Sequence, residues 1–236
     1  MKRLNANSRI VVFTGAGVSA ESGVKTFRDS DGLWENYRIE DVATPQAWVS
    51  NPKQVLDFYN QRRKQIIQAK PNAAHFALAE LQDYCSVTVI TQNIDDLHER
   101  AGSSKVIHLH GEITKARSEK NKALIQELSS DEIQIGDLAS DGAQLRPHIV
   151  WFGEEVPMMD LALQVTEFAD VFIVIGTSLN VYPAANLAYY APADSLKYVV
   201  DPQANSFNLD DDYKVYSTTA GVGVRKVVDE LINMIQ

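Results

Sequence analysis

Short apolar runs rich in β-branched residues recur along this chain of 236 residues, and they constrain its fold more than any other feature. Two of them, VTVIT at 87–91 and VFIVIG at 171–176, are apolar on both faces, as strands are when helices cover both sides of a sheet. Segments with helical spacing separate several of the runs, and this alternation is typical of an α/β fold with a doubly wound parallel sheet. The predicted strands are residues 9–14, 87–91, 105–109, 170–176 and 197–201.

The composition fits a single globular domain over residues 1–236. Hydrophobic residues make up 45% of the chain and charged residues 22%, and no apolar run is long enough to cross a bilayer. The first residues, MKRLNANSR, lack the apolar core of a signal peptide, so we expect a cytoplasmic protein. A net charge of −9 disfavours a nucleic-acid surface and is compatible with basic protein tails as partners. The one cysteine, Cys85, cannot form an internal disulfide, and its apolar context predicts a buried thiol.

A glycine turn follows the first predicted strand. The sequence Gly15-Ala16-Gly17 lets the backbone approach a ligand closely, and the amides of a following helix start would face a phosphate. Gly15, Gly17 and Ala20 match the GxGxx(G/A) pattern of Rossmann-like dinucleotide-binding folds. Because short glycine turns occur in many folds, a purely structural role stays open at this point.

The chain after this turn departs from the dehydrogenase pattern. A nicotinamide dehydrogenase continues into a second strand that ends in an acidic residue about 20 positions further on. Here the segment from Phe27 and Arg28 to Trp34 is polar and aromatic without a strand period, which is typical of a loop that folds over a bound ligand. A dinucleotide therefore fits the pattern, whereas hydride transfer does not.

Two segments interrupt the alternation of strands and helices. Residues 51–70 have a proline at the start and apolar residues at helical spacing, so they predict an amphipathic helix. Residues 112–146 are polar without a strong period, which predicts a small inserted subdomain or a partly mobile flap. We assign insertions at roughly 38–70 and 112–147 to this subdomain. Its candidate apolar anchors are Ala123, Leu124, Leu128, Ile133, Ile135 and Leu138.

Polar side chains gather where the predicted strands end, which is where ligands bind in doubly wound sheets. Asn93 and Asp95 offer the donors and acceptors that a carboxamide needs, although capping of the next helix is the simpler role for either. His108 and His110 alternate along a strand and share one face, where a histidine pair is more often structural than metal-binding. Asp201 ends the strand at 197–201 and can accept from the hydroxyls of an adenosine ribose.

Two further segments could hold a second substrate. Tyr59 and Arg62 are three apart on the predicted helix and could grip a small anion, unless Tyr59 is core and Arg62 belongs to a solvated basic edge. Residues 146–154, RPHIVWFGE, have a proline before an apolar run, which favours an extended conformation. An exposed strand of this kind can add a peptide through main-chain hydrogen bonds, and a plain core strand is the alternative.

Five ordered blocks of this sequence resemble the sirtuins, a family of NAD-dependent protein lysine deacylases. The blocks are GAGVSAESGVKTFRDSDGLW, TQNIDDLHERAG, HLHGEI, RPHIVWFGE and VIGTSLNVYPAANL. The resemblance implies NAD as a co-substrate that is cleaved, acyl-lysine proteins or peptides as the second substrate, and nicotinamide and O-acyl-ADP-ribose as products.

The resemblance also implies roles for single residues. His110, directly before a glycine, would be the general base, and an imidazole suits that task near neutral pH. The motif FYNQRR resembles the YxxR motif of the sirtuin class that acts on succinyl, malonyl and glutaryl lysine, so Arg62 would pair with an acyl carboxylate. The residues assigned to NAD are Gly15, Ala16, Gly17, Ala20, Phe27, Arg28, Gln92, Asn93, Asp95, Gly176, Thr177, Ser178, Asp201 and Ala220. Those assigned to the acyl-lysine substrate are Tyr59, Arg62, Val150, Phe152, Gly153 and Glu154.

The sequence departs from most sirtuins in one respect. These bind a structural zinc through two cysteine pairs before the FGE motif, but residues 112–146 contain neither cysteine nor histidine, so we expect no zinc. ADP-ribosyl transfer and NAD hydrolysis also displace nicotinamide and stay open as alternatives, as does a non-catalytic module that senses NAD or ADP-ribose. Retention of His110, Asn93 and Asp95 disfavours the sensing module.

Overall fold

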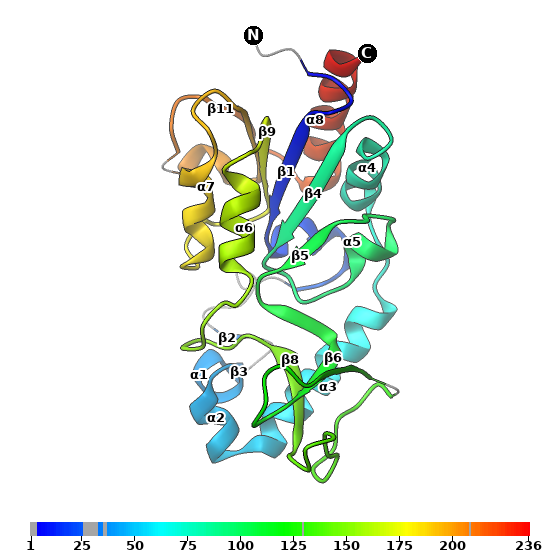
Figure 1. Ribbon diagram of the computed structural model, residues 1–236, viewed down its shortest axis with the longest axis vertical. Coiled ribbons are helices and arrows are strands. Elements are labelled where there is room, and N and C mark those ends of the chain that lie inside the picture. Colours follow the sequence, from blue (N-terminus) through cyan, green and yellow to red (C-terminus); the bar gives the residue numbers. More distant parts are fainter. Residues whose placement is uncertain (1–3, 26–32, 35–36, 129, 208) are drawn as a thin grey trace.

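The computed structural model describes residues 4–25, 33–34, 37–128, 130–207 and 209–236. It has a larger region built on a parallel sheet and a smaller region below it in Figure 1. Among the residues described, no helix combines the length and apolarity needed to cross a membrane.

A six-stranded parallel sheet with the order β11-β10-β9-β1-β4-β5 forms the larger region, so the predicted doubly wound α/β fold is confirmed. The five predicted strands are present within one or two residues of their expected ends. The sixth, β11, was not predicted because its sequence YKVY has two exposed residues and no apolar run. The strands are β1 (Arg9–Thr14), β4 (Ser86–Thr91), β5 (Val106–His108), β9 (Val171–Ile175), β10 (Leu196–Val200) and β11 (Tyr213–Tyr216).

Helices cover both faces of this sheet (Figure 1). Along β1, Ile10 and Val12 pack in the core under α4 and α8, whereas Val11 and Phe13 pack in the core under α6 and α7. The alternation follows from the two-residue period of a strand, and it explains why this run is apolar throughout. The helices of this region are α4 (Ala73–Leu81), α5 (Leu97–Arg100), α6 (Met159–Thr166), α7 (Leu187–Tyr190) and α8 (Ala220–Ile235).

The smaller region combines helices with a three-stranded antiparallel sheet of order β7-β6-β8. The predicted helix at 51–70 is confirmed as α3, whose start is capped by the Asn51 side chain accepting from Gln54 N. Side chains of α1 to α3 and of β6 and β8 share one hydrophobic cluster. The elements are β2 (Leu33–Trp34), β3 (Tyr37–Arg38), α1 (Ile39–Val42), α2 (Pro45–Ser50), α3 (Pro52–Gln68), β6 (Gly111–Ser118), β7 (Ile125–Glu127) and β8 (Leu145–Ile149).

The inserted segment is anchored differently from the prediction. Ile133 is a core residue with 1% exposure, as expected, but Ile135 and Leu138 are 57% and 58% exposed and Ala123 also faces solvent. Leu124 and Leu128 are half-buried. The apolar side chains of the insert therefore contribute less to the hydrophobic core than predicted, because much of this segment lies at the surface.

A buried amide on α3 replaces much of the missing apolar contact. Asn60 donates from Nδ2 to the Ile133 carbonyl at 3.0 Å and accepts from Ile133 N at 3.0 Å. The same Asn60 oxygen accepts from Arg63 Nη1 at 2.8 Å, and Arg63 Nε donates to the Ile113 carbonyl at 2.7 Å. These hydrogen bonds join α3 to both the insert and β6.

We expect Asn60→Ala to lower the free energy of unfolding by about 2–3 kcal/mol, because it leaves the peptide groups of Ile133 unpaired in a buried place. Denaturant unfolding measures this change, and hydrogen exchange at residues 130–135 locates it. Gln61→Ala, an exposed position on the same helix, is the matched control and should stay within about 0.5 kcal/mol of the parent. Equal stability of the two variants would contradict the anchoring role of Asn60.

Candidate active site

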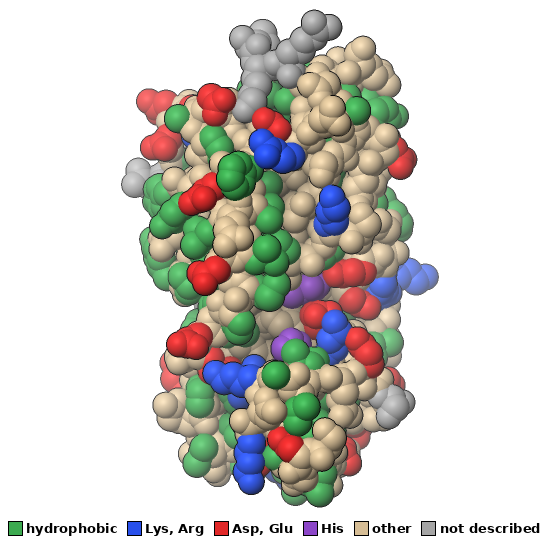
Figure 2. All heavy atoms as spheres, in the orientation of Figure 1, with side chains coloured by type: hydrophobic (Ala, Val, Ile, Leu, Met, Phe, Trp, Pro, Cys, Tyr) green, Lys and Arg blue, Asp and Glu red, His purple; other side chains and the backbone are tan. Residues whose placement is uncertain are grey.

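A cleft of about 670 Å³ lies at the carboxyl ends of the parallel strands and continues along α3 and the turn after β8. Histidine side chains reach the surface at the junction of the larger and smaller regions in Figure 2. The cleft brings together the predicted residues from both regions, with two exceptions. Phe27 and Arg28 lie outside the described residues. The predicted residues that line it are Gly15, Ala16, Gly17, Ala20, Tyr59, Arg62, Gln92, Asn93, Asp95, His110, Val150, Phe152, Gly153, Glu154, Gly176, Thr177, Ser178, Asp201 and Ala220.

Glycine is required in the turn after β1 because its backbone contacts the turn after β9. Gly17 N donates to the Gly176 carbonyl at 2.8 Å, and a Cβ on Gly17 would lie 2.6 Å from the Gly176 Cα. Gly176 has a φ of 60°, and a Cβ there would lie 2.4 Å from Val18 N. The glycines thus have the structural role left open by the sequence. They also line the cleft, so this role does not compete with ligand binding.

The loop after β4 carries a chain of polar contacts. Asn93 Nδ2 donates to Ser19 Oγ at 3.1 Å, and Ser19 Oγ donates to Asp95 Oδ2 at 3.1 Å. Asp95 Oδ1 accepts from Leu97 N at 3.2 Å, so this carboxylate also supports the start of α5, whose N-cap is Asp96. Burial raises the pKa of Asp95. Ser19 was missed because a serine after a glycine turn has no local signal for this distant contact.

His110 is oriented by a backbone carbonyl. Its Nδ1 lies 2.9 Å from the Gln92 oxygen, and because a carbonyl only accepts, Nδ1 carries the proton and Nε2 keeps a lone pair. Burial lowers the pKa of His110, which favours the neutral imidazole near pH 7. This is the protonation state that a general base needs.

His108 is held in a different environment. Its Nδ1 donates to the Asn93 carbonyl at 3.1 Å, and its Nε2 lies 2.8 Å from Glu99 Oε1. Burial works against the charged form, but the hydrogen bond and charge of Glu99 raise the pKa of His108. Strand β5 ends at His108, so His110 lies in the following turn and not at the end of the strand.

Tyr59 and Arg62 are both buried at the cleft, with 0% and 5% exposure. The alternative of a solvated basic edge is therefore wrong for Arg62. Trp151 Nε1 donates to Tyr59 Oη at 3.1 Å, and Arg62 Nη2 lies 3.4 Å from the Lys25 carbonyl. A phenol and a guanidinium consequently face the same cleft from one helix.

The segment at 146–154 is only partly the strand that was predicted. Strand β8 ends at Ile149, and residues 150–154 form an irregular turn. Val150 N donates to the His110 carbonyl at 2.9 Å, and Phe152 N donates to the Ala43 carbonyl at 3.0 Å. These donors are therefore already used within the chain, which corrects the expectation of an exposed strand across the whole segment.

The end of the cleft at β9 and β10 carries amide, hydroxyl and carboxylate groups. Gln92 Nε2 donates to Thr177 Oγ1 at 2.9 Å, and Asp201 Oδ1 accepts from Gln203 N at 2.8 Å. Glu21 was not predicted, yet it lines the cleft and accepts from Gly221 N at 2.6 Å, at the start of α8. Across the described part of the chain, no group of three or more His, Cys, Asp or Glu residues could hold a metal ion.

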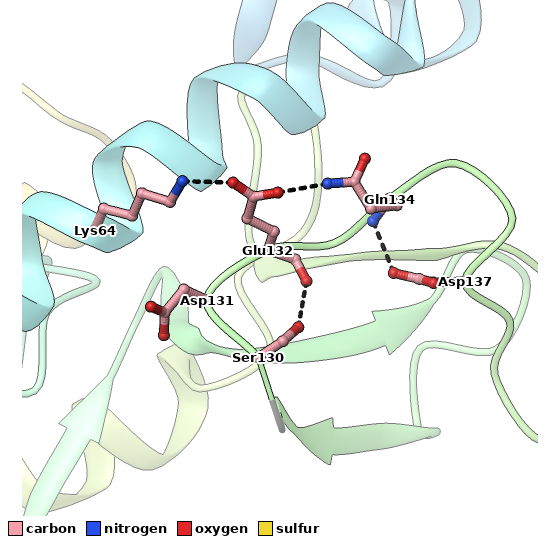
Figure 3. A pocket seen from close by; sticks show the side chains of 6 residues that line it. All are labelled: Lys64, Ser130, Asp131, Glu132, Gln134 and Asp137. Carbon is pink, nitrogen blue, oxygen red and sulfur yellow. Dashed lines mark hydrogen bonds and ion pairs between the residues drawn. The ribbon is translucent and has the colours of Figure 1, made fainter.

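A second, open depression of about 520 Å³ lies on the smaller region, and Figure 3 shows its side chains. Lys64 and Gln134 both pair with the Glu132 carboxylate, and Gln134 N donates to Asp137 Oδ2 at 2.7 Å. Because these groups bond to one another at the surface, we assign this depression no ligand.

Comparisons with known proteins relate this chain to one family. A family model described as the Sir2 family matches residues 15–183. An NAD-dependent protein deacylase of Helicobacter pylori is 51% identical over 225 residues, covering 95% of this chain and 98% of the relative. A protein of the same name from Bacteroides thetaiotaomicron is 50% identical over 228 residues, covering 94% and 97%. The crystal structure of a Sir2 homologue in complex with NAD is 37% identical, with a TM-score of 0.85 over 99% of this chain and 98% of that one.

The opposite environments of the two histidines predict opposite titration shifts. We expect the His110 ring to titrate below its ordinary value of 6.5 and the His108 ring above it, as followed by the imidazole carbon-bound protons in NMR spectra. Protonated His108 stabilises the folded state, and this contribution to the free energy of unfolding is fully present below pH 6.5. It is lost as the pH rises through the folded pKa of His108. His110 instead lowers the free energy of unfolding as the pH falls through 6.5, because the imidazole binds a proton more readily in the unfolded chain than in the folded one.

The variants His110→Gln and His108→Gln assign the two resonances. A His110 midpoint at or above that of His108 would contradict the environments described here.

Proposed function

Since the chain belongs to the Sir2 family, we propose that it is an NAD-dependent protein lysine deacylase with a preference for acyl groups that end in a carboxylate. The observation that carries this proposal is a single cleft that contains the glycine turn, His110 and the buried pair Tyr59 and Arg62. In this reaction NAD, acyl-lysine and water give nicotinamide, lysine and O-acyl-ADP-ribose.

The cleft offers groups suited to NAD along the carboxyl edge of the sheet. Gly15, Ala16 and Gly17 line this edge, and we assign their turn to the pyrophosphate because small residues let a ligand approach the backbone closely. Thr177 and Asp201 offer a hydroxyl and a carboxylate to the ribose hydroxyls. Asn93 and Asp95, linked through Ser19, offer amide and carboxylate groups to the nicotinamide carboxamide.

His110 is suited to act as the base in the second part of the reaction. The acyl oxygen attacks C1′ of the nicotinamide ribose, the bond to nicotinamide breaks, and an imidate forms. His110 Nε2 then takes the proton of a ribose hydroxyl, which attacks the imidate carbon. Hydrolysis of that adduct frees the lysine and leaves the acyl group on ADP-ribose. Because Nδ1 is fixed on the Gln92 carbonyl, the ring is already in the required tautomer.

The preference for acidic acyl groups rests on the burial of Arg62. A carboxylate that leaves water for a cleft of this kind loses hydration, and only a paired cation offsets the loss. Arg62 and Tyr59 offer charge-assisted and neutral hydrogen bonds to the end of such a chain. An acetyl group has no carboxylate and gains nothing from this pair.

We expect wild-type protein to remove succinyl from a lysine peptide only when NAD is present, and Arg62→Met to lower kcat/KM for this peptide by about 10- to 100-fold. Acetyl-peptide turnover should change much less, because the lost contact is to the acyl carboxylate. Mass spectrometry of the two peptides and of O-acyl-ADP-ribose measures both reactions. Lys64→Met removes an exposed cation of the same helix and is the matched control.

The same assay separates the alternatives. An equal loss of both activities in Arg62→Met would refute the carboxylate contact while leaving the deacylase proposal in place. No NAD-dependent loss of either acyl group from the wild type would refute that proposal. Nicotinamide release without peptide, or ADP-ribose attached to protein, would identify NAD hydrolysis or ADP-ribosyl transfer, and His110→Ala should abolish deacylation.

A further inference from the structure

Trp151 contacts the acyl end of the cleft, although the sequence did not single it out. It follows β8, is 2% exposed and lines the cleft. Its indole Nε1 donates to Tyr59 Oη at 3.1 Å, across 92 positions of sequence. Because an indole nitrogen only donates, the phenol oxygen must accept this bond, and the phenol proton is directed elsewhere. Burial raises the pKa of Tyr59, so the phenol keeps that proton at neutral pH.

The indole is clamped from several directions. The Arg146 guanidinium carbon lies 3.2 Å from the centroid of the Trp151 ring, which places the cation over its face. The Trp48 ring packs against it with centroids 5.8 Å apart. The backbone N of Trp151 donates to Glu154 Oε2 at 2.9 Å. These contacts hold the indole beside Tyr59.

The contacts around the indole are supported by a buried triad of Arg117, Glu154 and Arg146. Glu154 accepts from Arg117 Nη2 at 3.0 and 3.1 Å and from both Nη atoms of Arg146 at 3.0 and 3.1 Å. The three side chains are 4–9% exposed, so removal of one leaves an uncompensated buried charge. Both carboxylate oxygens of Glu154 are engaged in this way. Its contacts accordingly favour a supporting role for Glu154 over direct binding of a peptide.

The charges of this triad also match the proposed substrate. Two guanidiniums face one carboxylate, which leaves a net positive charge behind Trp151. At the Tyr59 phenol, the charges of Arg146 and Arg62 act in one direction and the charge of Glu154 acts in the other. A neutral acyl group would gain little from this field, whereas an anionic one would be attracted.

We propose that Trp151 is a positioning residue that sets acyl specificity, because its indole N–H orients the Tyr59 phenol toward an acyl carboxylate while the Arg117–Glu154–Arg146 triad holds the indole in place. This inference rests on the proposed function. It extends that function from the pair on α3 to a residue in the turn after β8.

Trp151→Phe tests the inference because it keeps an aromatic ring for Arg146 and Trp48 but removes the donor to Tyr59. We expect the ratio of kcat/KM for succinyl peptide to that for acetyl peptide to fall about three- to tenfold, as for loss of one buried hydrogen bond. The loss should lie in the KM for succinyl peptide and leave the KM for NAD unchanged. Trp48→Phe, which removes the neighbouring indole donor to Glu119, is the matched control and should leave the ratio unchanged.

A double-mutant cycle tests whether the effect passes through the phenol. In a Tyr59→Phe background, Trp151→Phe should cause no further fall in the ratio, because the group it orients is already absent. A second measurement does not depend on turnover: Tyr59→Phe should shift the indole N–H resonance of Trp151 in NMR spectra of the protein, with the tryptophan variants providing the assignment.

The outcomes separate this inference from the proposed function. An unchanged ratio in Trp151→Phe, or fully additive losses in the double variant, would overturn the role of Trp151 even if Arg62→Met behaves as expected. An unshifted indole resonance in Tyr59→Phe would also overturn it. Failure of the wild type to act on either peptide would instead refute the proposed function, and the inference with it.

Discussion

The close contact between the turns after β1 and β9 is the constraint on which the rest of the structure depends. β1 and β9 are parallel neighbours, so both strands end at the same edge of the sheet and the turns that follow them meet. They fit only because Gly17 and Gly176 have no side chain in the contact. Because these turns are tight, the edge of the sheet stays open for the cleft. Gln92, from the loop after β4, donates to Thr177, from the loop after β9, beside them.

A second feature of the molecule is the number of arginines buried in or beside the smaller region. Arg62, Arg63, Arg117 and Arg146 are each no more than 5% exposed. Burying a cation is unfavourable unless hydrogen bonds and opposite charges compensate it. Arg63 donates to backbone carbonyls and to Asn60, and Arg117 and Arg146 share Glu154. Polar contacts thus supplement the apolar cluster here, and they supply positive charge close to the cleft.

Much of the fold could be predicted from local patterns, whereas many residues of the cleft were predicted from the resemblance to the sirtuins. Strands β1, β4, β9 and β10 are apolar runs bounded by polar or glycine residues, and α3 has a helical period, so short windows of sequence identify them. The predictions failed where burial depended on distant partners. Ile135 was predicted as an apolar anchor but lies at the surface. For Arg62, local composition favoured the alternative of a solvated edge, and this alternative is wrong because the side chain is buried. Strand β11 was missed for the same reason, since its pairing with β10 outweighs its weak apolar character.

The sequence by itself determined the parallel sheet, the glycine turn and the set of polar residues that meet at one edge, because each depends on spacing along a few neighbouring positions. Only the tertiary structure decided which of these groups work together. The bond from Trp151 to Tyr59 spans 92 positions, and the bond from Asn93 to Ser19 spans 74. Contacts of this range leave no local period in the chain, since they form only when the strands and α3 have packed into place.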